Sequence, residues 1–599
     1  MKQFFGGCLG AFIGVLLGII ILAVVMFAAI TSSISGTLGA DKQEKTEKKD
    51  ISGPVMRIDL SGEIYDTPKK NWFSNFNFDD LFKDKDIILP QLARTIEYAK
   101  QDNKIKGIYI RMYNFNASVT QLEEIRKAIK DFQSSGKWVY VYADSYFQGA
   151  YYLASAANKI AMHPQGMFLW KGLASQITFY KKALDKLDIQ VQVFRHGKFK
   201  SAVEPFILEK MSDENKHQMR TLLNSVWNTM LANISEDRKI SIQELNNYAN
   251  NLDTRDAELT LKYKFIDLIS DETQVESIIA EQIKKDKDQL FTDYHLYKKN
   301  SNKLYAEEST DKIAIVYASG QIADEATGSN NDDIITPAKL LSTLKKIEDN
   351  KKIKAVVLRV NSPGGSAFAS DIIWGAIKKL KAKKPVIVSF GDVAASGGYY
   401  ISCGADYIFT DKNTITGSIG VFGLMPNFQT LMQKDLGLNT DTVKTNAYAD
   451  FMSVLRPVQP KEYEAIMYGI EKVYKTFLSR VSEGRKLRVS YIDSIGQGRV
   501  WSGAGAVQLK LADKTGTLED AIAYAASKVG LKNFDIDEYP KIKPPFQQFL
   551  DNMNDGALEE KILKTQTGPL YKDILFFKQL LKDKQFTYLS LLPYQIKIN

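Results

Sequence analysis

The chain has 599 residues, too many for one hydrophobic core, so at least two core-bearing domains are expected. With 44% hydrophobic and 25% charged residues, it has the composition of an ordinary globular protein. The net charge of +9 is spread over 79 basic and 70 acidic residues without a basic stripe interleaved with aromatics, which argues against nucleic-acid binding.

The N-terminus carries a long apolar segment. Residues 4–30 contain no charged side chain, and a helix of that length crosses a hydrocarbon core of about 30 Å. A cleavable signal peptide has a shorter apolar core, of roughly 7 to 15 residues. We therefore predict a membrane anchor over residues 1–30 and a polar tether over residues 31–53. The flanking lysines alone leave the orientation of this anchor open.

Beyond the tether the sequence repeats itself. "PVMRIDLSGEI" (54–64) resembles "KIAIVYASGQI" (312–322), and "KIKGIYIRM" (104–112) matches "KIKAVVLRV" (352–360). The register then stays at 248 residues, which pairs the adjacent tyrosines of "GAYYLA" with those of "GGYYIS". Self-similarity of this kind indicates two homologous domains in tandem.

We place the first repeat at residues 54–305 and the second at residues 306–545. In each, short apolar β-branched runs alternate with segments of helical period, which predicts an α/β fold with largely parallel, buried strands. Ligands and chemistry gather at the carboxyl ends of such strands. The segment after residue 545 (546–599) is helical in period, matches neither repeat, and has no role that the sequence decides.

Two glycine turns at predicted strand ends distinguish the second repeat. "GDVAASGGYY" (391–400) carries Ser396 among small residues, and the matching position of the first repeat is Gln148. "LRVNSPGGSA" (358–367) has two glycines where the first repeat has none. Backbone N–H groups in such turns can approach a ligand closely, so Ser396 is a candidate nucleophile and the N–H groups of Gly365 and Gly397 are candidate oxyanion donors.

A serine nucleophile needs a base, and no histidine follows His295. A Ser-His-Asp triad within the second repeat is thereby excluded. The first repeat offers "FRHGKFKSAVEPF" (194–206), where Lys200 lies beside small and apolar residues, and burial would favour its neutral form. Lys198 is a nearby alternative and His196 is the second choice of base.

Other groups complete the expected site or lie outside it. Ser418, in "TITGSIGVFG", could orient the lysine amine. Asp392 and its counterpart Asp144 are interpreted as structural turn or cap residues. The cysteines, Cys8 and Cys403, show neither a disulfide framework nor a metal-ligand spacing, and we expect no metal and no organic cofactor.

"NSPGGS", "ASGGYYIS", "TGSIGVFG" and "GKFKSAVEPF", on tandem α/β repeats behind one anchor, resemble the long form of the signal peptide peptidase A (protease IV) family. The resemblance implies two tandem ClpP/crotonase-like domains in a serine peptidase of the bacterial inner membrane that digests remnant signal peptides. It implies a Ser-Lys dyad of Ser396 and Lys200, supported by Ser418. It also implies a homotetramer in contact with membrane lipid, with its body outside the cytoplasm.

Two other function classes remain open on the sequence. A crotonase-type acyl-CoA enzyme would suit the fold and the glycine turns, and would give Ser396 and Lys200 no joint role. A catalytically inactive membrane scaffold would tolerate the loss of Ser396.

Overall fold

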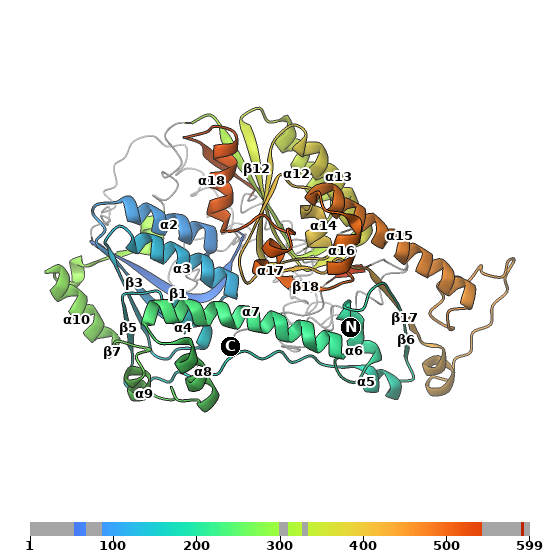
Figure 1. Cartoon of the computed structure of the whole chain (residues 1–599), viewed down its shortest axis with the longest axis horizontal. Coiled ribbons are helices and arrows are strands. Elements are labelled where there is room, and N and C mark those ends of the chain that lie inside the picture. Colours follow the sequence, from blue (N-terminus) through green and yellow to red (C-terminus); the bar gives the residue numbers. More distant parts are fainter. Residues whose placement is uncertain (1–52, 68–86, 299–308, 326–333, 542–588, 592–599) are drawn as a thin grey trace, which may run out of the picture. The chain divides into compact units, whose positions relative to one another are not determined.

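The structure is a computed structural model that describes residues 53–67, 87–298, 309–325, 334–541 and 589–591 (Figure 1). The predicted anchor, all of the predicted tether but residue 53, and most of the segment after residue 545 lie outside these ranges. Within them, no helix combines the length and the apolar character that crossing a membrane requires.

The first repeat is built on a parallel sheet. Its strands are β1 (Val55–Tyr65), β2 (Ile87–Ile88), β3 (Gly107–Asn116), β4 (Trp138–Ala143), β5 (Lys159–Met162), β7 (Leu268–Ile269) and β8 (Phe291–Asp293). They lie in the order β2-β1-β3-β4-β5-β7, with β8 on β1, and every pairing is parallel. Apolar side chains from these strands, such as Ile58, Ile110 and Val141, are buried.

Helices cover this sheet, and several begin at side-chain caps. Ser118 and Gln121 form a capping box at the start of one of them, which satisfies backbone N–H groups that have no partner within the helix. The helices are α2 (Leu89–Gln101), α3 (Val119–Gln133), α4 (Gln148–Ala154), α5 (Lys181–Lys186), α6 (Glu204–Ile207), α7 (Asp213–Arg238), α8 (Ile242–Asn251), α9 (Ala257–Lys262), α10 (Glu272–Ile283) and α11 (Tyr294–Tyr297), with short 3₁₀ turns η2 (Ser201–Val203) and η3 (Lys287–Gln289).

The second repeat has a sheet of the same kind. Its strands are β9 (Lys312–Ser319), β12 (Ile353–Ser362), β14 (Val386–Ala395), β15 (Tyr407–Thr410), β16 (Ile415–Gly417), β18 (Val500–Ser502), β19 (Lys514–Thr515) and β20 (Asp535–Tyr539). Their order is β18-β16-β14-β12-β9-β20, with β15 between β14 and β19. All these pairings are parallel except that of β16 with β18.

The helices of the second repeat reproduce the spacing of the first. They are α12 (Pro337–Asp349), α13 (Ala367–Lys381), α14 (Gly397–Ser402), α15 (Pro460–Arg485), α16 (Val489–Ile495), α17 (Gly503–Gln508) and α18 (Leu518–Lys528), with one π turn, η6 (Leu431–Asp435). Both bounds of α12 and of α13 lie 248 residues after those of α2 and α3. The predicted α/β class with largely parallel, buried strands is confirmed.

A third sheet joins the two repeats. Its strands are β6 (Gln190–Arg195), β10 (Gln321–Ile322), β11 (Ile334–Ile335), β13 (Gly364–Ser366), β17 (Phe422–Asn427) and β21 (Leu589–Leu591), in the order β11-β10-β13-β21-β17-β6. Figure 1 shows β6 beside β17, and the two pair antiparallel from Phe422 opposite Arg195 to Asn427 opposite Gln190. This pairing carries the segment after β6 into the second repeat.

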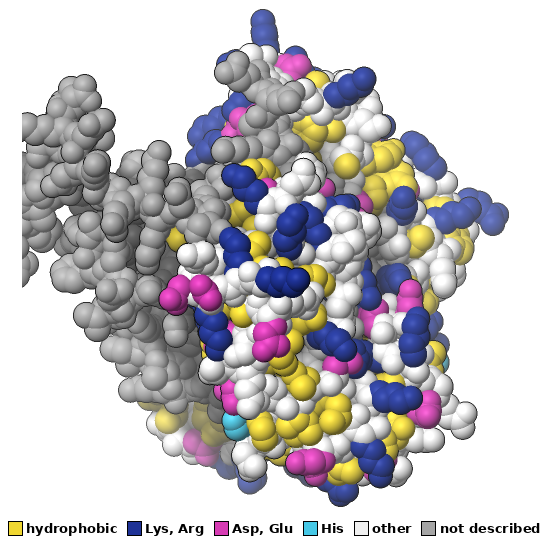
Figure 2. Space-filling view, turned by 90° about the vertical axis from the view of Figure 1, so that its left-hand side faces the viewer, with side chains coloured by type: hydrophobic (Ala, Val, Ile, Leu, Met, Phe, Trp, Pro, Cys, Tyr) yellow, Lys and Arg dark blue, Asp and Glu magenta, His cyan; other side chains and the backbone are white. Residues whose placement is uncertain are grey.

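Figure 2 shows one face of the molecule, on the side where α10 lies in Figure 1. Lysine and arginine side chains are scattered among aspartate, glutamate and hydrophobic side chains there. Among the described residues of this face, the basic side chains form no continuous stripe of the kind found on nucleic-acid-binding surfaces.

Candidate active site

Ser396 lies between the end of β14 and the start of α14. It is fully buried and has φ 57° and ψ −115°, a conformation that non-glycine residues rarely adopt. Its backbone is fixed on both sides, because its N–H donates to the carbonyl of Gly417 at 2.8 Å and its carbonyl accepts from Tyr400 at 2.8 Å. The main chain at Ser396 is therefore held in place on both sides.

Lys200 reaches this serine from the other repeat. It lies between β6 and η2, and the antiparallel pairing of β6 with β17 places it next to the second repeat. Its Nζ lies 2.8 Å from Oγ of Ser396 and 3.0 Å from Oγ of Ser418, two atoms to which it donates. The structure thus brings together the three side chains that the sequence predicted as nucleophile, base and lysine-orienting group.

The surroundings of Lys200 favour its neutral form. The side chain is 1% exposed, and the ring of Phe422 lies 5.8 Å from Nζ. A β-carbon at Gly498 would lie 2.6 Å from the β-carbon of Lys200, so only glycine fits against it. Burial lowers the pKa of Lys200 to about 7, because removing water penalises the ammonium form.

The two glycines predicted as oxyanion donors lie next to each other. A β-carbon at Gly397 would lie 3.2 Å from the backbone nitrogen of Gly365 and 2.7 Å from Oγ of Ser370. A β-carbon at Gly365 would lie 1.9 Å from the carbonyl oxygen of Ile322. Neither position has room for a side chain, and Gly397 is the first residue of α14, where N–H groups have no partner within the helix.

The alternative bases lie elsewhere. Lys198 is exposed at the surface. Nδ1 of His196 lies 2.6 Å from Oε1 of Glu471, and its ring stacks on Tyr474 with centroids 3.9 Å apart. These contacts account for His196 as a structural residue.

The first repeat fills its matching position with an amide. Gln148 is buried, and its Oε1 accepts from the backbone N–H groups of Lys171 and Gly172, both at 3.0 Å. Its Nε2 donates to the carbonyl of Gly172 at 3.1 Å. The position of Ser396 in the second repeat is therefore occupied in the first repeat by a glutamine that holds the backbone of Lys171 and Gly172 by hydrogen bonds.

A short strand lies along the edge of the site. β21 pairs antiparallel with β13, with Ser590 opposite Gly365, and Leu589 lies opposite Phe422 of β17. The gap between β13 and β17 thus accepts an extended chain, which runs past the glycine turn that leads to the site.

Polar side chains outside the predicted site form hydrogen bonds between the two repeats. Asp392, expected to be a turn or cap residue, accepts hydrogen bonds from Ser118 and Thr120 of the first repeat. Asp66 of the first repeat accepts from Asn361 of the second at 3.0 Å. Asn361 stands within the "NSPGG" motif, but nothing in the sequence indicated its partner, which lies 295 residues away.

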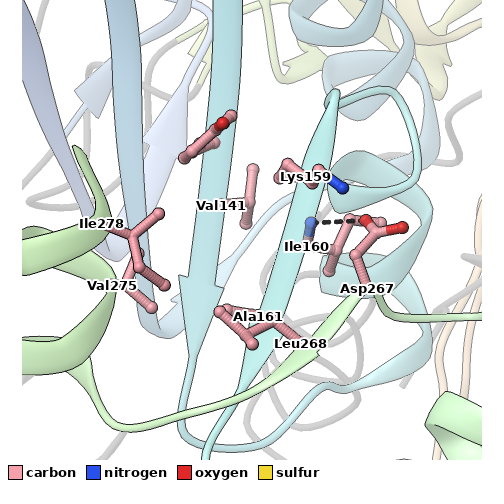
Figure 3. A pocket seen from close by; sticks show the side chains of 9 residues that line it. Val141, Lys159, Ile160, Ala161, Asp267, Leu268, Val275 and Ile278 are labelled. Carbon is pink, nitrogen blue, oxygen red and sulfur yellow. Dashed lines mark hydrogen bonds between the residues drawn. The ribbon is translucent and has the colours of Figure 1, made fainter. Parts of the chain in front are cut away.

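A separate pocket lies in the first repeat, away from these residues. Figure 3 shows it lined by side chains of β4, β5 and β7 and by Val275 and Ile278 of α10. At its rim, the backbone N–H of Ile160 donates to Asp267 at 2.8 Å. None of its lining residues belongs to the predicted site.

The sequence was also compared with known proteins. The family model described as "Peptidase family S49" matches residues 131–286 and 378–532, one stretch in each repeat, and a model described as "Clp protease" matches residues 309–410. The chain therefore has a ClpP-like α/β fold with two S49 repeats.

Full-length relatives agree with this match. Protease 4 of Salmonella typhi is 34% identical over 543 residues, which are 86% of this chain and 85% of the relative. Protease 4 of Haemophilus influenzae is 38% identical, over 72% of each chain. Serine protease SPPA of Arabidopsis thaliana is 32% identical, over 80% of this chain and 70% of its own. The chain belongs to peptidase family S49 and is a serine peptidase.

Proposed function

We propose that this serine peptidase is a membrane-anchored endopeptidase that degrades cleaved signal peptides with a dyad of Ser396 and Lys200. The observation that carries the dyad is the distance of 2.8 Å between Nζ of Lys200 and Oγ of Ser396 at a fully buried position. The acyl-CoA alternative gave these residues no joint role, and the family match favours peptide hydrolysis.

In the proposed mechanism, neutral Lys200 accepts the proton of Ser396 as Oγ attacks a peptide carbonyl. The backbone N–H groups of Gly365 and Gly397 hold the developing oxyanion, a contribution of typically 100- to 1,000-fold in rate per donor. The lysine ammonium then protonates the leaving amine, and the acyl-enzyme remains. Water, activated by the same amine, releases the acyl group and restores Ser396.

Ser418 keeps the amine in place during these proton transfers. Its Oγ accepts from Lys200 at 3.0 Å, and its backbone is fixed because its N–H donates to the carbonyl of Arg499 at 2.7 Å. With one hydrogen directed to Ser418, the lone pair of the neutral amine is free to face Ser396.

The substrate peptide is proposed to bind as an added strand between β13 and β17. β21 demonstrates that this gap accepts an antiparallel extended segment opposite Gly365. Main-chain hydrogen bonds of this kind give affinity with little dependence on sequence, which suits the degradation of varied peptides.

The proposed location follows from the apolar N-terminus. Residues 1–30 would anchor the chain in the cytoplasmic membrane, residues 31–53 would tether it, and the two repeats (54–305 and 306–545) would form the extracytoplasmic body. The segment 546–599 would follow as an extension. Cleaved signal peptides remain in the same membrane, so the anchor would bring the enzyme to its substrate among the lipids.

The repeats also support a homotetramer. Leu222 of α7 packs against Ala395 and Ile415, which joins the first repeat to the second. The matching residues of the first repeat, Phe147 and Met167, are 62% and 55% exposed. The counterpart of Leu222 at the same offset of 248 residues, Ile470 of α15, is fully buried in the second repeat. The first repeat therefore leaves uncovered the apolar surface whose counterpart in the second repeat is covered by α7, and a second copy of the chain would cover it.

The dyad is tested by peptide hydrolysis with the full chain in detergent and a signal-peptide substrate. We expect Ser396→Ala to reduce the rate to background and Lys200→Met to reduce kcat by at least about 100-fold, the usual contribution of a general base. Lys198→Met is the matched control and should keep full activity. Substantial activity in Lys200→Met would move the base to another residue, His196 first.

A further inference from the structure

One amide side chain joins β12, which leads into the turn with Gly365, to β14, which ends one residue before Ser396. Asn361 stands near the end of β12, and its Oδ1 accepts from the backbone N–H of Val393 in β14 at 3.2 Å. It thereby connects the main chain four residues before Gly365 to the main chain three residues before Ser396. The parallel ladder of these two strands is irregular at this point, with a register shift between Val360 and Ser362. The side-chain bond spans that irregularity.

The other end of the amide is held by the first repeat. Nδ2 of Asn361 donates to Oδ2 of Asp66 at 3.0 Å, and Oδ1 of Asp66 accepts from Nε2 of Gln121 at 3.2 Å. Asp66 is 7% exposed, so this carboxylate has little contact with water. Because a carboxylate only accepts, it fixes the amide with Nδ2 toward Asp66 and Oδ1 toward Val393.

A buried arginine strengthens the same arrangement. Nη1 of Arg359 donates to Oγ of Ser389 at 2.9 Å and to the carbonyl of Phe390 at 3.0 Å, both in β14. Its Nη2 donates to Glu124 of the first repeat at 2.6 Å and lies 3.5 Å from Oδ2 of Asp66. β14 is therefore held from β12 at two points, and carboxylates of the first repeat orient both of the side chains that hold it.

The first repeat lacks the equivalent link. The position that matches Asn361 is Tyr113, which is 43% exposed, and the position that matches Val393 is Ser145. The corresponding strands β3 and β4 of the first repeat pair in parallel up to Met112 opposite Ala143. Neither Tyr113 nor Ser145 carries an amide side chain. The fold thus forms without this link, and the link occurs in the repeat that carries Ser396.

We propose that Asp66 is a positioning residue which, through Asn361, sets the separation between the oxyanion turn at Gly365 and the nucleophile Ser396. In this proposal the first repeat supplies the base, Lys200, and also aligns Ser396 with the oxyanion turn at Gly365. This inference rests on the proposed roles of Ser396, Gly365 and Gly397. It predicts that the loss of Asp66 acts on the transition state more than on substrate binding.

The test compares Asp66→Ala, Asn361→Ala and their double variant in the full chain, with Asp66→Asn as the conservative variant. Asp66→Asn keeps an oxygen that can accept from Nδ2 of Asn361. Glu519→Ala is the matched control, because it removes a different inter-repeat ion pair, with Arg94 at 3.0 Å. For each variant, kcat and KM are measured, together with the inhibition constants of a peptide aldehyde and of a cleaved product peptide. The aldehyde forms a tetrahedral adduct with the serine and depends on the oxyanion donors, whereas the product peptide does not.

We expect Asp66→Ala and Asn361→Ala each to lower kcat by about 10- to 100-fold with KM changed by less than about threefold. The inhibition constant of the peptide aldehyde should rise by the same factor as kcat falls. The inhibition constant of the product peptide should stay unchanged. The double variant should be no worse than either single one, and Asp66→Asn should regain most of the activity. An unchanged kcat would overturn the proposal. A fall in activity with an unchanged inhibition constant of the aldehyde would also overturn it, since that combination shows only that a smaller fraction of the protein is folded. If Ser396→Ala were as active as the parent, the proposed function itself would fail.

Discussion

At the residue scale, the burial of Lys200, the proposed base, predicts the pH range in which the enzyme works. With a pKa of about 7, the amine is charged below that pH and cannot accept the serine proton. We expect kcat/KM to fall about tenfold for each pH unit below 7 and to level off above about 8. A profile measured between pH 5 and 9 tests this, and Lys198→Met should leave it unchanged. An inflection near pH 10 would show that the base is a solvated lysine.

The same burial predicts that the folded state loses stability as the pH falls. In the unfolded chain Lys200 titrates near 10.4, so below that pH the unfolded state binds the proton more tightly and the folded state loses stability. The penalty grows as pH falls from about 10 to 7 and is complete below 7, on the order of 5 kcal/mol for the shift to about 7. We expect Lys200→Met to unfold at a higher temperature than the parent at pH 6, and at nearly the same temperature at pH 10. A difference that is independent of pH would contradict this.

The lack of a hydroxyl at Gln148 and the absence of histidine after residue 295 pointed to Ser396 and to a base in the first repeat, and the family resemblance then favoured Lys200 over Lys198 and His196 and gave Ser418 its supporting role. The structure places Nζ of Lys200 2.8 Å from Oγ of Ser396 and 3.0 Å from Oγ of Ser418. Asp66 and Asn361 could not be predicted in the same way. Polar residues after apolar strands are common, and the contact between these two exists only once the repeats pack together. A carboxylate acting through an amide leaves no spacing pattern in the chain.

At the element scale, β21 occupies the position proposed for the substrate. Ending the chain after residue 585 would remove β21 and with it the pairing of β21 with β13 and β17. We expect KM for a peptide substrate to fall several-fold with kcat unchanged, because a competing strand is removed. Steady-state kinetics on the shortened and full chains measure this. Ser590→Pro in the full chain is the matched variant and should act in the same direction, since proline cannot donate to a ladder. An unchanged KM would place the peptide elsewhere.

The elements themselves were largely predictable, and their partners were less so. The apolar runs and helical periods indicated both sheets, since a parallel strand buried on both faces is apolar throughout. The run "IQVQVF" (189–194) alternates between apolar and polar residues, which predicts a strand, but the pattern does not indicate that this strand, β6, pairs with β17 of the other repeat. Pairing between distant strands depends on tertiary packing, which local pattern does not encode.

At the scale of the whole molecule, the exposed apolar residues of the first repeat predict the assembly. We expect Phe147→Glu with Met167→Glu to convert the proposed tetramer into smaller species, because charges would be buried in the contact between copies. Light scattering of the purified protein in detergent measures the mass. Val443→Glu, at a fully exposed apolar residue, is the control and should leave the mass unchanged. A parent that is already monomeric would exclude the assembly.

The division of the dyad between repeats has a consequence for the time course of biosynthesis. Lys200 and Ser396 are 196 residues apart, and at about 5 to 20 residues per second the ribosome needs roughly 10 to 40 s to add the second after the first. A growing chain therefore contains Lys200 before Ser396 has been added. Hydrolysis by the proposed dyad can start only after both repeats have been made and have packed together. Any cellular machinery that handles the unfinished chain is, for that interval, in contact with a protein whose proposed dyad is incomplete.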